Sequence, residues 1–99
     1  MSFHIDHNPY ALADVQRIFR YYKRRSPGAA IRFLEAMDKA LSSISRNPLQ
    51  YAEGDENTRT CLLKKYPYLV IYRKYHRSVT IFAVSHAKRR QQHWRKRLP

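Results

Sequence analysis

Apolar residues in the first half of the chain recur at the three- and four-residue spacing of helices. The first stripe comprises Leu12, Val15, Ile18, Phe19 and Tyr22, and the second comprises Ala30, Phe33, Leu34, Met37, Leu41 and Ile44. Asn8-Pro9 and Ser26-Pro27 each combine a helix-capping residue with a proline suited to the first helical position, and Asn47-Pro48 ends the second stripe. Two stripes joined by so short a connection predict an antiparallel helical hairpin.

The rest of the chain has the alternating pattern of strands. Residues 2–6 alternate polar and apolar, and the stretches 58–64, 67–74 and 78–85 are rich in Val, Ile, Tyr and Thr. Short links predict that the last three strands form an antiparallel meander, and residues 49–57 are typical of a surface loop. The predicted fold is a single α+β domain over residues 1–99, with the order β-α-α-β-β-β. The helical hairpin packs on a small antiparallel sheet, and residues 88–97 form a short terminal helix or an ordered tail.

Charge is distributed very unevenly along this chain of 99 residues. The net charge is +13, and all seven acidic residues lie before residue 57. Residues 61–99 contain eleven basic residues and no acidic one, so this part alone carries +11. Such a surface indicates an anionic partner, either nucleic acid or an acidic protein. A hydrophobic fraction of 43% still allows a core, so the chain is not a disordered basic tail.

Several classes of protein and site lack sequence support. No apolar run is long enough to cross a membrane, and the N-terminus has no signal-peptide pattern, so the cytoplasm is expected. Two glycines cannot build a phosphate-binding loop, and His4 and His7 have no third ligand nearby in sequence, so we expect no cofactor and no metal. Cys61 is followed by leucines and is expected to be a small buried residue rather than a nucleophile.

The remaining candidate chemistry is basic and aromatic. If residues 86–97 are helical, one side of that helix collects His86, Arg89, Arg90, His93, Trp94 and Arg97. Arg73, Lys64 and Lys65 add positive charge on the preceding strands. Arginine binds phosphate with two parallel hydrogen bonds, histidine titrates near neutral pH, and tryptophan offers a stacking surface. The set predicts a target-binding surface; the simpler interpretation is that Trp94 pins the tail to the core and the charges are solvated.

These strings resemble the RelE/ParE superfamily, the small toxins of bacterial type II toxin–antitoxin modules. The resemblance rests on the strand Tyr66-Pro-Tyr-Leu-Val-Ile-Tyr-Arg73, a β-hairpin, and a strand ending in Val84-Ser-His86 followed by basic residues and Trp94. Ser26-Pro27 and Asn47-Pro48 fit the bounds of the second helix of the family. The likeness spans about residues 3–97, and the pattern is closest to the ParE branch, often described as plasmid stabilisation proteins.

The two branches imply different activities. ParE-like members block DNA gyrase and have no established catalytic set, so the resemblance favours a protein that is not an enzyme. RelE-like members cut mRNA in the ribosome with strand lysines, a strand arginine, and a C-terminal arginine followed by a tyrosine. This chain keeps Arg89 as the C-terminal arginine but has Leu69, Thr60 and Leu62 at the strand positions, and no tyrosine near Trp94.

The leading hypothesis is therefore a ParE-like gyrase inhibitor that an acidic antitoxin neutralises in a hetero-oligomer. Candidate antitoxin-binding residues on an apolar groove are Tyr21, Tyr22, Phe33, Met37 and Tyr68. One alternative is a RelE-like ribosome-dependent endoribonuclease, in which Arg89 and Arg73 bind the scissile phosphate and His86 is the acid–base candidate. Another alternative is a basic nucleic-acid-binding module without toxin activity.

Overall fold

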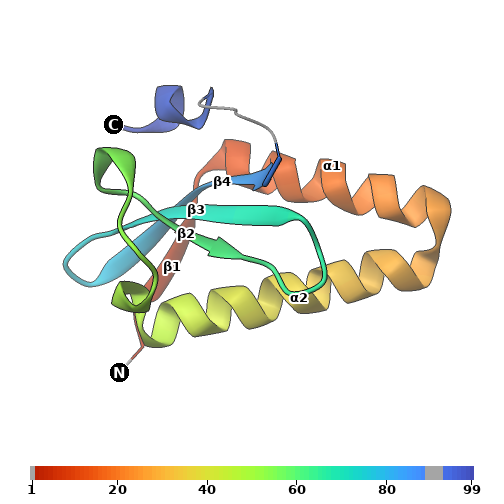
Figure 1. Cartoon of the computed structure of the whole chain (residues 1–99), viewed down its shortest axis with the longest axis horizontal. Coiled ribbons are helices and arrows are strands. Elements are labelled where there is room, and N and C mark those ends of the chain that lie inside the picture. The colour runs from red at the N-terminus through yellow and green to blue at the C-terminus, as the bar shows by residue number, and fades with distance from the viewer. Residues whose placement is uncertain (1, 89–92) are drawn as a thin grey trace.

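Asparagine and serine side chains begin the two helices at the predicted residues. The computed structural model describes residues 2–88 and 93–99. The Asn8 side chain accepts a backbone N–H and starts helix α1 (Pro9–Arg25), and Ser26 does the same for helix α2 (Pro27–Arg46). These caps satisfy N–H groups that lack a partner within the helix. The predicted helical hairpin is confirmed (Figure 1).

Four strands form one sheet in the order β1-β4-β3-β2 (Figure 1). Their bounds are β1 (His4–His7), β2 (Arg59–Leu62), β3 (Tyr68–Lys74) and β4 (Ser78–His86). The meander of β2, β3 and β4 is antiparallel, as predicted. β1 instead runs parallel to β4, so the sheet is mixed rather than purely antiparallel. A short link forces neighbouring strands to run antiparallel, whereas the rest of the domain separates β1 from β4 and leaves their relative direction free.

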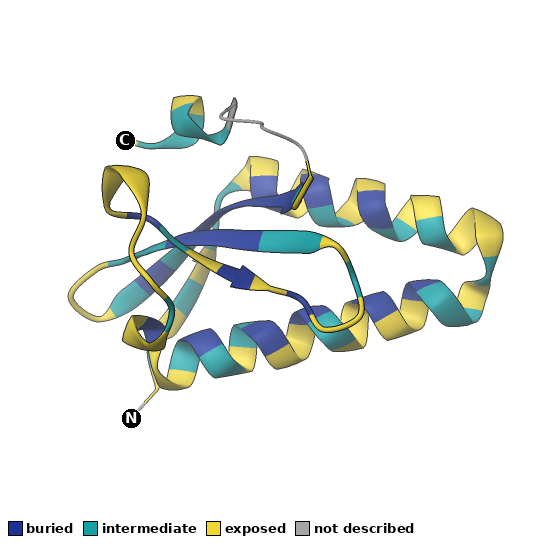
Figure 2. Ribbon diagram, viewed as in Figure 1, coloured by how far each residue is buried: buried dark blue, intermediate teal, exposed yellow. Residues whose placement is uncertain are grey.

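Both helices pack on one face of the sheet and enclose the main core. The largest side chains there with no solvent exposure are Phe33, Ile44, Val70, Tyr72 and Ile81. Buried positions of α2 lie along its side nearest the sheet in Figure 2. Alternate side chains of β3, such as Val70 and Tyr72, meet this helical layer, as a pleated strand requires. In β4 the core residues are Val79, Ile81 and Val84, because the pairing with β3 shifts register after Ile81.

The buried stripes of the helices differ in detail from the predicted ones. In α1, Leu12 is 48% exposed, whereas Ala11 and Asp14 are buried. In α2, Leu34 is 38% exposed and Ala40 faces inward. Both stripes keep helical spacing, but they pass through small or polar residues that a search for large apolar side chains overlooks.

The C-terminal segment, residues 93–99, contains part of the stretch 88–97 that was predicted to be a short helix or an ordered tail. β4 continues through His86, which pairs with Tyr68, so His86 is part of the sheet and cannot share a helix face with the later basic residues. Among the described residues after β4, His93–Arg97 form a short 3₁₀ helix. Pairing at the end of β4 satisfies backbone groups that a helix beginning at residue 86 would have to satisfy itself.

Candidate functional site

Aromatic rings gather where the helical hairpin meets the turn between β2 and β3. This aromatic cluster comprises Tyr22, Phe33, Tyr66, Tyr68 and His86, with neighbouring ring centroids 5.2 to 6.4 Å apart. The Tyr66 hydroxyl also donates to a carbonyl at the start of α2, 3.1 Å away. Edge-to-face aromatic contacts stabilise beyond the area they bury. The cluster therefore holds the turn and the end of β4 against the hairpin.

The residues predicted to bind an antitoxin fall into two groups. Tyr22 and Tyr68 are half-buried members of the aromatic cluster, and Tyr21 is exposed beside Tyr22. Phe33 is 0% and Met37 is 4% exposed, so the prediction that these two line a surface groove is wrong. Both belong to the core between α2 and the sheet. An apolar residue at helical spacing serves a core and a groove equally well, which is why the sequence did not separate them.

The Tyr22 hydroxyl is a hydrogen-bonding group rather than a base. Burial, and then the neighbouring Tyr68, raise the pKa of Tyr22 to about 12. A tyrosine is protonated at neutral pH in any case, and burial, which would strip the phenolate of its hydration, keeps Tyr22 protonated to still higher pH. The aromatic cluster thus offers stacking and hydrogen-bond donors.

His86 and Arg73 lie far apart, on opposite faces of the sheet. His86 is in register with Tyr68 at the start of β3, and the two rings meet edge-on at 5.4 Å. Arg73 is five residues further along β3, about 17 Å away at strand spacing, and an odd separation places it on the opposite face. Its guanidinium donates to the Glu56 carbonyl and lies 5.9 Å from the Phe82 ring centroid. The structure does not bring this predicted acid–base and phosphate-binding pair to one site.

Other members of the predicted target-binding set are described only in part. Arg89 and Arg90 lie outside the described residues, and His93 is described only in its backbone. Trp94 is half-buried in the C-terminal segment, with the Arg95 guanidinium 5.8 Å from its ring centroid. The one-sided arrangement predicted for a continuous helix is therefore not the arrangement of the described members.

A polar node at Asp14 anchors the C-terminal segment. Asp14 is 2% exposed; its Oδ2 accepts from the Val84 N–H at 3.0 Å and from Arg97 Nη1 at 2.8 Å. Arg97 Nη1 also donates to the Phe82 carbonyl at 2.9 Å. β1 pairs with β4 only as far as Ile81, so these side chains satisfy the strand edge beyond it. Arg97, predicted to bind a target, is here engaged within the domain.

Sequence reasoning missed Asp14, although the sequence held a signal for it. Ala11, Asp14 and Ile18 share one side of α1 at spacings of three and four, so an acidic residue interrupts the inward stripe. An ionised group at such a position needs a partner, because burying an unpaired charge is costly. What the sequence could not indicate is that the partner would be Arg97.

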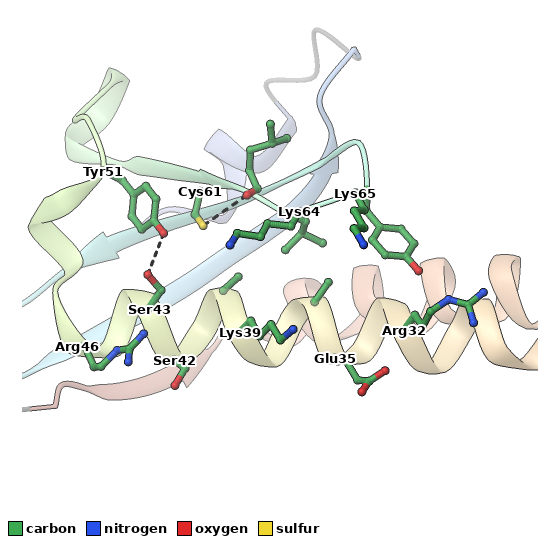
Figure 3. Close-up of a pocket in the computed structure, with 15 residues that line it drawn as sticks. Arg32, Glu35, Lys39, Ser42, Ser43, Arg46, Tyr51, Cys61, Lys64 and Lys65 are labelled. Carbon is green, nitrogen blue, oxygen red and sulfur yellow. Dashed lines mark hydrogen bonds between the residues drawn. The ribbon is translucent and has the colours of Figure 1, made fainter.

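Lys64 and Lys65 line a groove between α2 and the edge strand β2 (Figure 3). The groove has a volume of about 870 Å³. Five cationic side chains and one acidic one line it, namely Arg32, Lys39, Arg46, Lys64, Lys65 and Glu35. Its location places the two lysines on a surface separate from the Asp14 node. The predicted target-binding residues thus lie on at least two surfaces.

The described part of the chain contains neither a cluster of metal-binding side chains nor a reactive thiol. Among residues 2–88 and 93–99, no three His, Cys, Asp or Glu side chains lie close enough to hold a metal ion. Cys61 is 3% exposed, and burial raises the pKa of its thiol, which keeps it in the unreactive protonated form. Within the same described ranges, no helix is long and apolar enough to span a membrane.

Comparison with known proteins places these features in a family. The family described as ParE toxin of type II toxin-antitoxin system, parDE, matches residues 5–91. The fold is similar to the chromosomal ParDE TA system from P. aeruginosa, with a TM-score of 0.76 and 16% identity, covering 88% of this chain and 98% of that one. It is also similar to a mutant of the E. coli toxin RelE in the free state, with a TM-score of 0.64 and 16% identity, covering 89% and 86%. No curated protein sequence matches.

Proposed function

This chain belongs to the ParE family of type II toxin–antitoxin toxins, and from that premise we propose that it inhibits DNA gyrase and is neutralised by an acidic cognate antitoxin. The family match over residues 5–91 carries the proposal, because it takes in the hairpin and all of the sheet except His4 of β1. The net charge of +13 supports an acidic partner. Neutralisation then means that the antitoxin binds the toxin in a hetero-oligomer.

The placement of His86 and Arg73 also supports gyrase inhibition over RNA cleavage. An endoribonuclease of the RelE kind needs cations and an acid–base group around one phosphate, because oriented charges stabilise the transition state. His86 faces the helices and Arg73 the opposite side, about 17 Å along the strand. Similarity to RelE at 16% identity concerns the fold alone.

We assign target binding to exposed and half-buried cations and aromatics of the C-terminal half. Of the residues that the structure describes, Trp94, His86, Lys64 and Lys65 have side chains open to a partner. A protein target meets such a surface through aromatic anchors and charge complementarity. Arg97 instead supports this surface by fixing the C-terminal segment.

Supercoiling by purified gyrase tests the proposal directly. The full chain, made by cell-free synthesis, is titrated into a supercoiling reaction, and we expect inhibition that saturates with toxin. Trp94→Ala should weaken inhibition about tenfold or more, as expected for an aromatic anchor. Gln16→Ala, an exposed change on α1, is the matched control and should inhibit as the parent does.

Two outcomes would overturn the gyrase assignment. One is full supercoiling at saturating toxin. The other is mRNA cleavage in a translating extract that disappears in His86→Ala and Arg89→Ala, which would establish the RelE-like activity. Growth arrest on expression, relieved by the protein of the adjacent reading frame, separates a toxin from a simple nucleic-acid-binding module.

A further inference from the structure

A stripe of exposed arginine and tyrosine residues runs along one side of α1. Spacings of three, four and seven positions connect its members, which places them on the same side of the helix. At 1.5 Å per residue, this α1 stripe is about 21 Å long. No residue of α1 lines the groove of Lys64 and Lys65, so the stripe is a separate cationic surface. It comprises Tyr10, Arg17, Arg20, Tyr21 and Arg24, all of them exposed.

Little negative charge opposes the arginines of the α1 stripe. The single acidic residue of α1 is Asp14, which is 2% exposed and is bound by both Arg17 and Arg97. The Arg17 side chain stays 60% exposed beside this carboxylate. Within residues 2–88 and 93–99, none of the ion pairs involves Arg20 or Arg24. The stripe therefore presents a net positive charge to solvent.

The stability of α1 explains only part of this charge. Cations in the last turn of a helix are stabilised by the helix dipole, which accounts for Lys23, Arg24 and Arg25. Arg17 and Arg20 lie before that turn, where the dipole has little effect. Arg20 and Arg24 are four positions apart, and like charges at this spacing destabilise a helix. A bound anion would offset this repulsion, so the stripe is better explained by a ligand than by the helix alone.

Both tyrosines of the stripe have a guanidinium over the ring. The Arg25 guanidinium lies 4.4 Å from the ring centroid of Tyr21, and the Arg97 guanidinium lies 5.3 Å from that of Tyr10. Each cation occupies one ring face that could otherwise stack on a base. The phenol hydroxyl can still donate a hydrogen bond. Tyrosine hydroxyls and arginines are both groups that contact phosphate oxygens in protein–DNA complexes.

The shape and polarity of the α1 stripe favour duplex DNA over a protein or a single strand. A duplex presents one phosphate per 3.4 Å along each strand, and Arg17 and Arg24 are about 10.5 Å apart, close to three such steps. The centre of a protein–protein interface is poor in charged residues, whereas protein–DNA interfaces are polar and strongly positive. Arginines stand at the centre of this stripe. A single strand binds largely by stacking on open ring faces, and these rings are partly covered.

We propose that the α1 stripe binds the phosphate backbone of duplex DNA without reading its sequence. Arg17, Arg20 and Arg24 meet phosphates along one strand, and the hydroxyls of Tyr10 and Tyr21 donate to phosphate oxygens beside them. Contacts to phosphates fix the position of a protein on DNA but carry no sequence information. The proposal goes beyond the function proposed above and depends neither on gyrase nor on an antitoxin.

Salt-dependent DNA binding with a matched control tests this surface. The full-length chain is titrated onto a fluorescent 20-base-pair duplex, and anisotropy is followed between 0.05 and 0.2 M salt. Arg20→Gln with Arg24→Gln should weaken binding about tenfold or more. The slope of log affinity against log salt should also become shallower by about 2, because each lost phosphate contact removes about 0.9. Two duplexes of unrelated sequence should bind the parent within about threefold of each other.

The control removes the same charge from surfaces away from α1. Lys39→Gln with Arg77→Gln changes exposed residues of α2 and of the turn between β3 and β4. This pair should weaken DNA binding no more than about threefold and should leave the slope unchanged within about 0.5. Thermal unfolding followed by circular dichroism verifies that both double variants fold.

Four outcomes would overturn the proposal. The first is no binding of duplex DNA by the parent chain, and the second is an equal loss in the two double variants, which would mean that DNA responds only to net charge. The third is tighter binding of a single-stranded 20-mer that disappears in Tyr10→Leu, because the stripe would then stack on bases. The fourth is unchanged DNA binding by the α1 variant together with weaker binding of the protein of the adjacent reading frame, which would make the stripe a protein interface.

Discussion

The two faces of the sheet are closed in different ways. The helix-facing side is covered by apolar packing in which Val70, Tyr72 and Ile81 have no solvent exposure. Away from this layer, Ile71 and Phe82 are each 3% exposed, and the C-terminal segment contacts β4 and forms ion pairs with Asp14 and Asp55. The same sheet is thus covered on one side by apolar packing and on the other by a segment attached through ion pairs.

Apolar packing and ion pairs respond differently to solution conditions. Hydrophobic burial is insensitive to moderate salt, whereas exposed ion pairs are screened at high ionic strength. Hydrogen bonding on the outer side is also incomplete. Arg73 Nε and Arg95 Nε are shielded from solvent and have no hydrogen-bond partner among the described residues. The helical layer therefore sets the global stability, and the outer layer is the part that a partner or salt can rearrange.

Phe33→Ala should cause the largest loss of stability among these predictions, because it removes a large side chain from the apolar layer. Phe33 is 0% exposed and stacks against Tyr22, so the substitution should lower the free energy of unfolding by about 4 kcal/mol. Urea denaturation followed by circular dichroism measures it. Phe33→Leu keeps most of the volume and should cost roughly 1 kcal/mol, which keeps the comparison measurable if the alanine variant does not fold. If Phe33→Ala instead lost antitoxin binding with unchanged stability, Phe33 would be an antitoxin-binding surface residue, as the sequence predicted.

Asp14→Ala should cost about 3 kcal/mol, nearly as much as a core truncation. It leaves the Arg97 guanidinium, only 13% exposed, without its carboxylate and the Val84 N–H without an acceptor. A double-mutant cycle with Arg97→Met isolates the pair, and we expect a coupling of about 1.5 kcal/mol. Asp38→Ala, an exposed change on α2, is the control and should stay within about 0.5 kcal/mol. A coupling near zero would show that the C-terminal segment docks without this pair.

The helical hairpin and the meander could be predicted because their determinants are local. Asn8 and Ser26 cap their own helices, and alternation along a strand is visible within seven residues. The observed order of the two helices and four strands agrees with the predicted β-α-α-β-β-β order. Parallel pairing of β1 with β4 escaped prediction because no short link specifies it.

The candidate site was harder to predict because its key contacts are distant in sequence. Asp14 and Arg97 are 83 positions apart, and no local pattern joins them. The separation of His86 from Arg73 follows from strand register and side-chain alternation, which become certain only when the β3–β4 pairing is known. The charge of Lys64 and Lys65 is visible in the sequence, but the other wall of the groove they line comes from cations of α2, which are distant in sequence and meet β2 only in the fold.

The ion pair between Arg95 and Asp55 should have the smallest coupling free energy of the contacts considered, and its salt dependence tests most clearly how the outer layer is held. Its N–O distance is 2.5 Å, but Asp55 is 71% exposed, so solvent screens the attraction. A double-mutant cycle with Arg95→Gln and Asp55→Asn should give a coupling of about 0.5 kcal/mol at 0.05 M salt and none at 1 M, where the Debye length is about 3 Å. The Asp14 pair, measured in the same way, should keep most of its coupling at 1 M because it is buried. Equal salt sensitivity of the two pairs would mean that the C-terminal segment is held by exposed charges throughout, and that the Asp14 node is not the anchor of the outer layer.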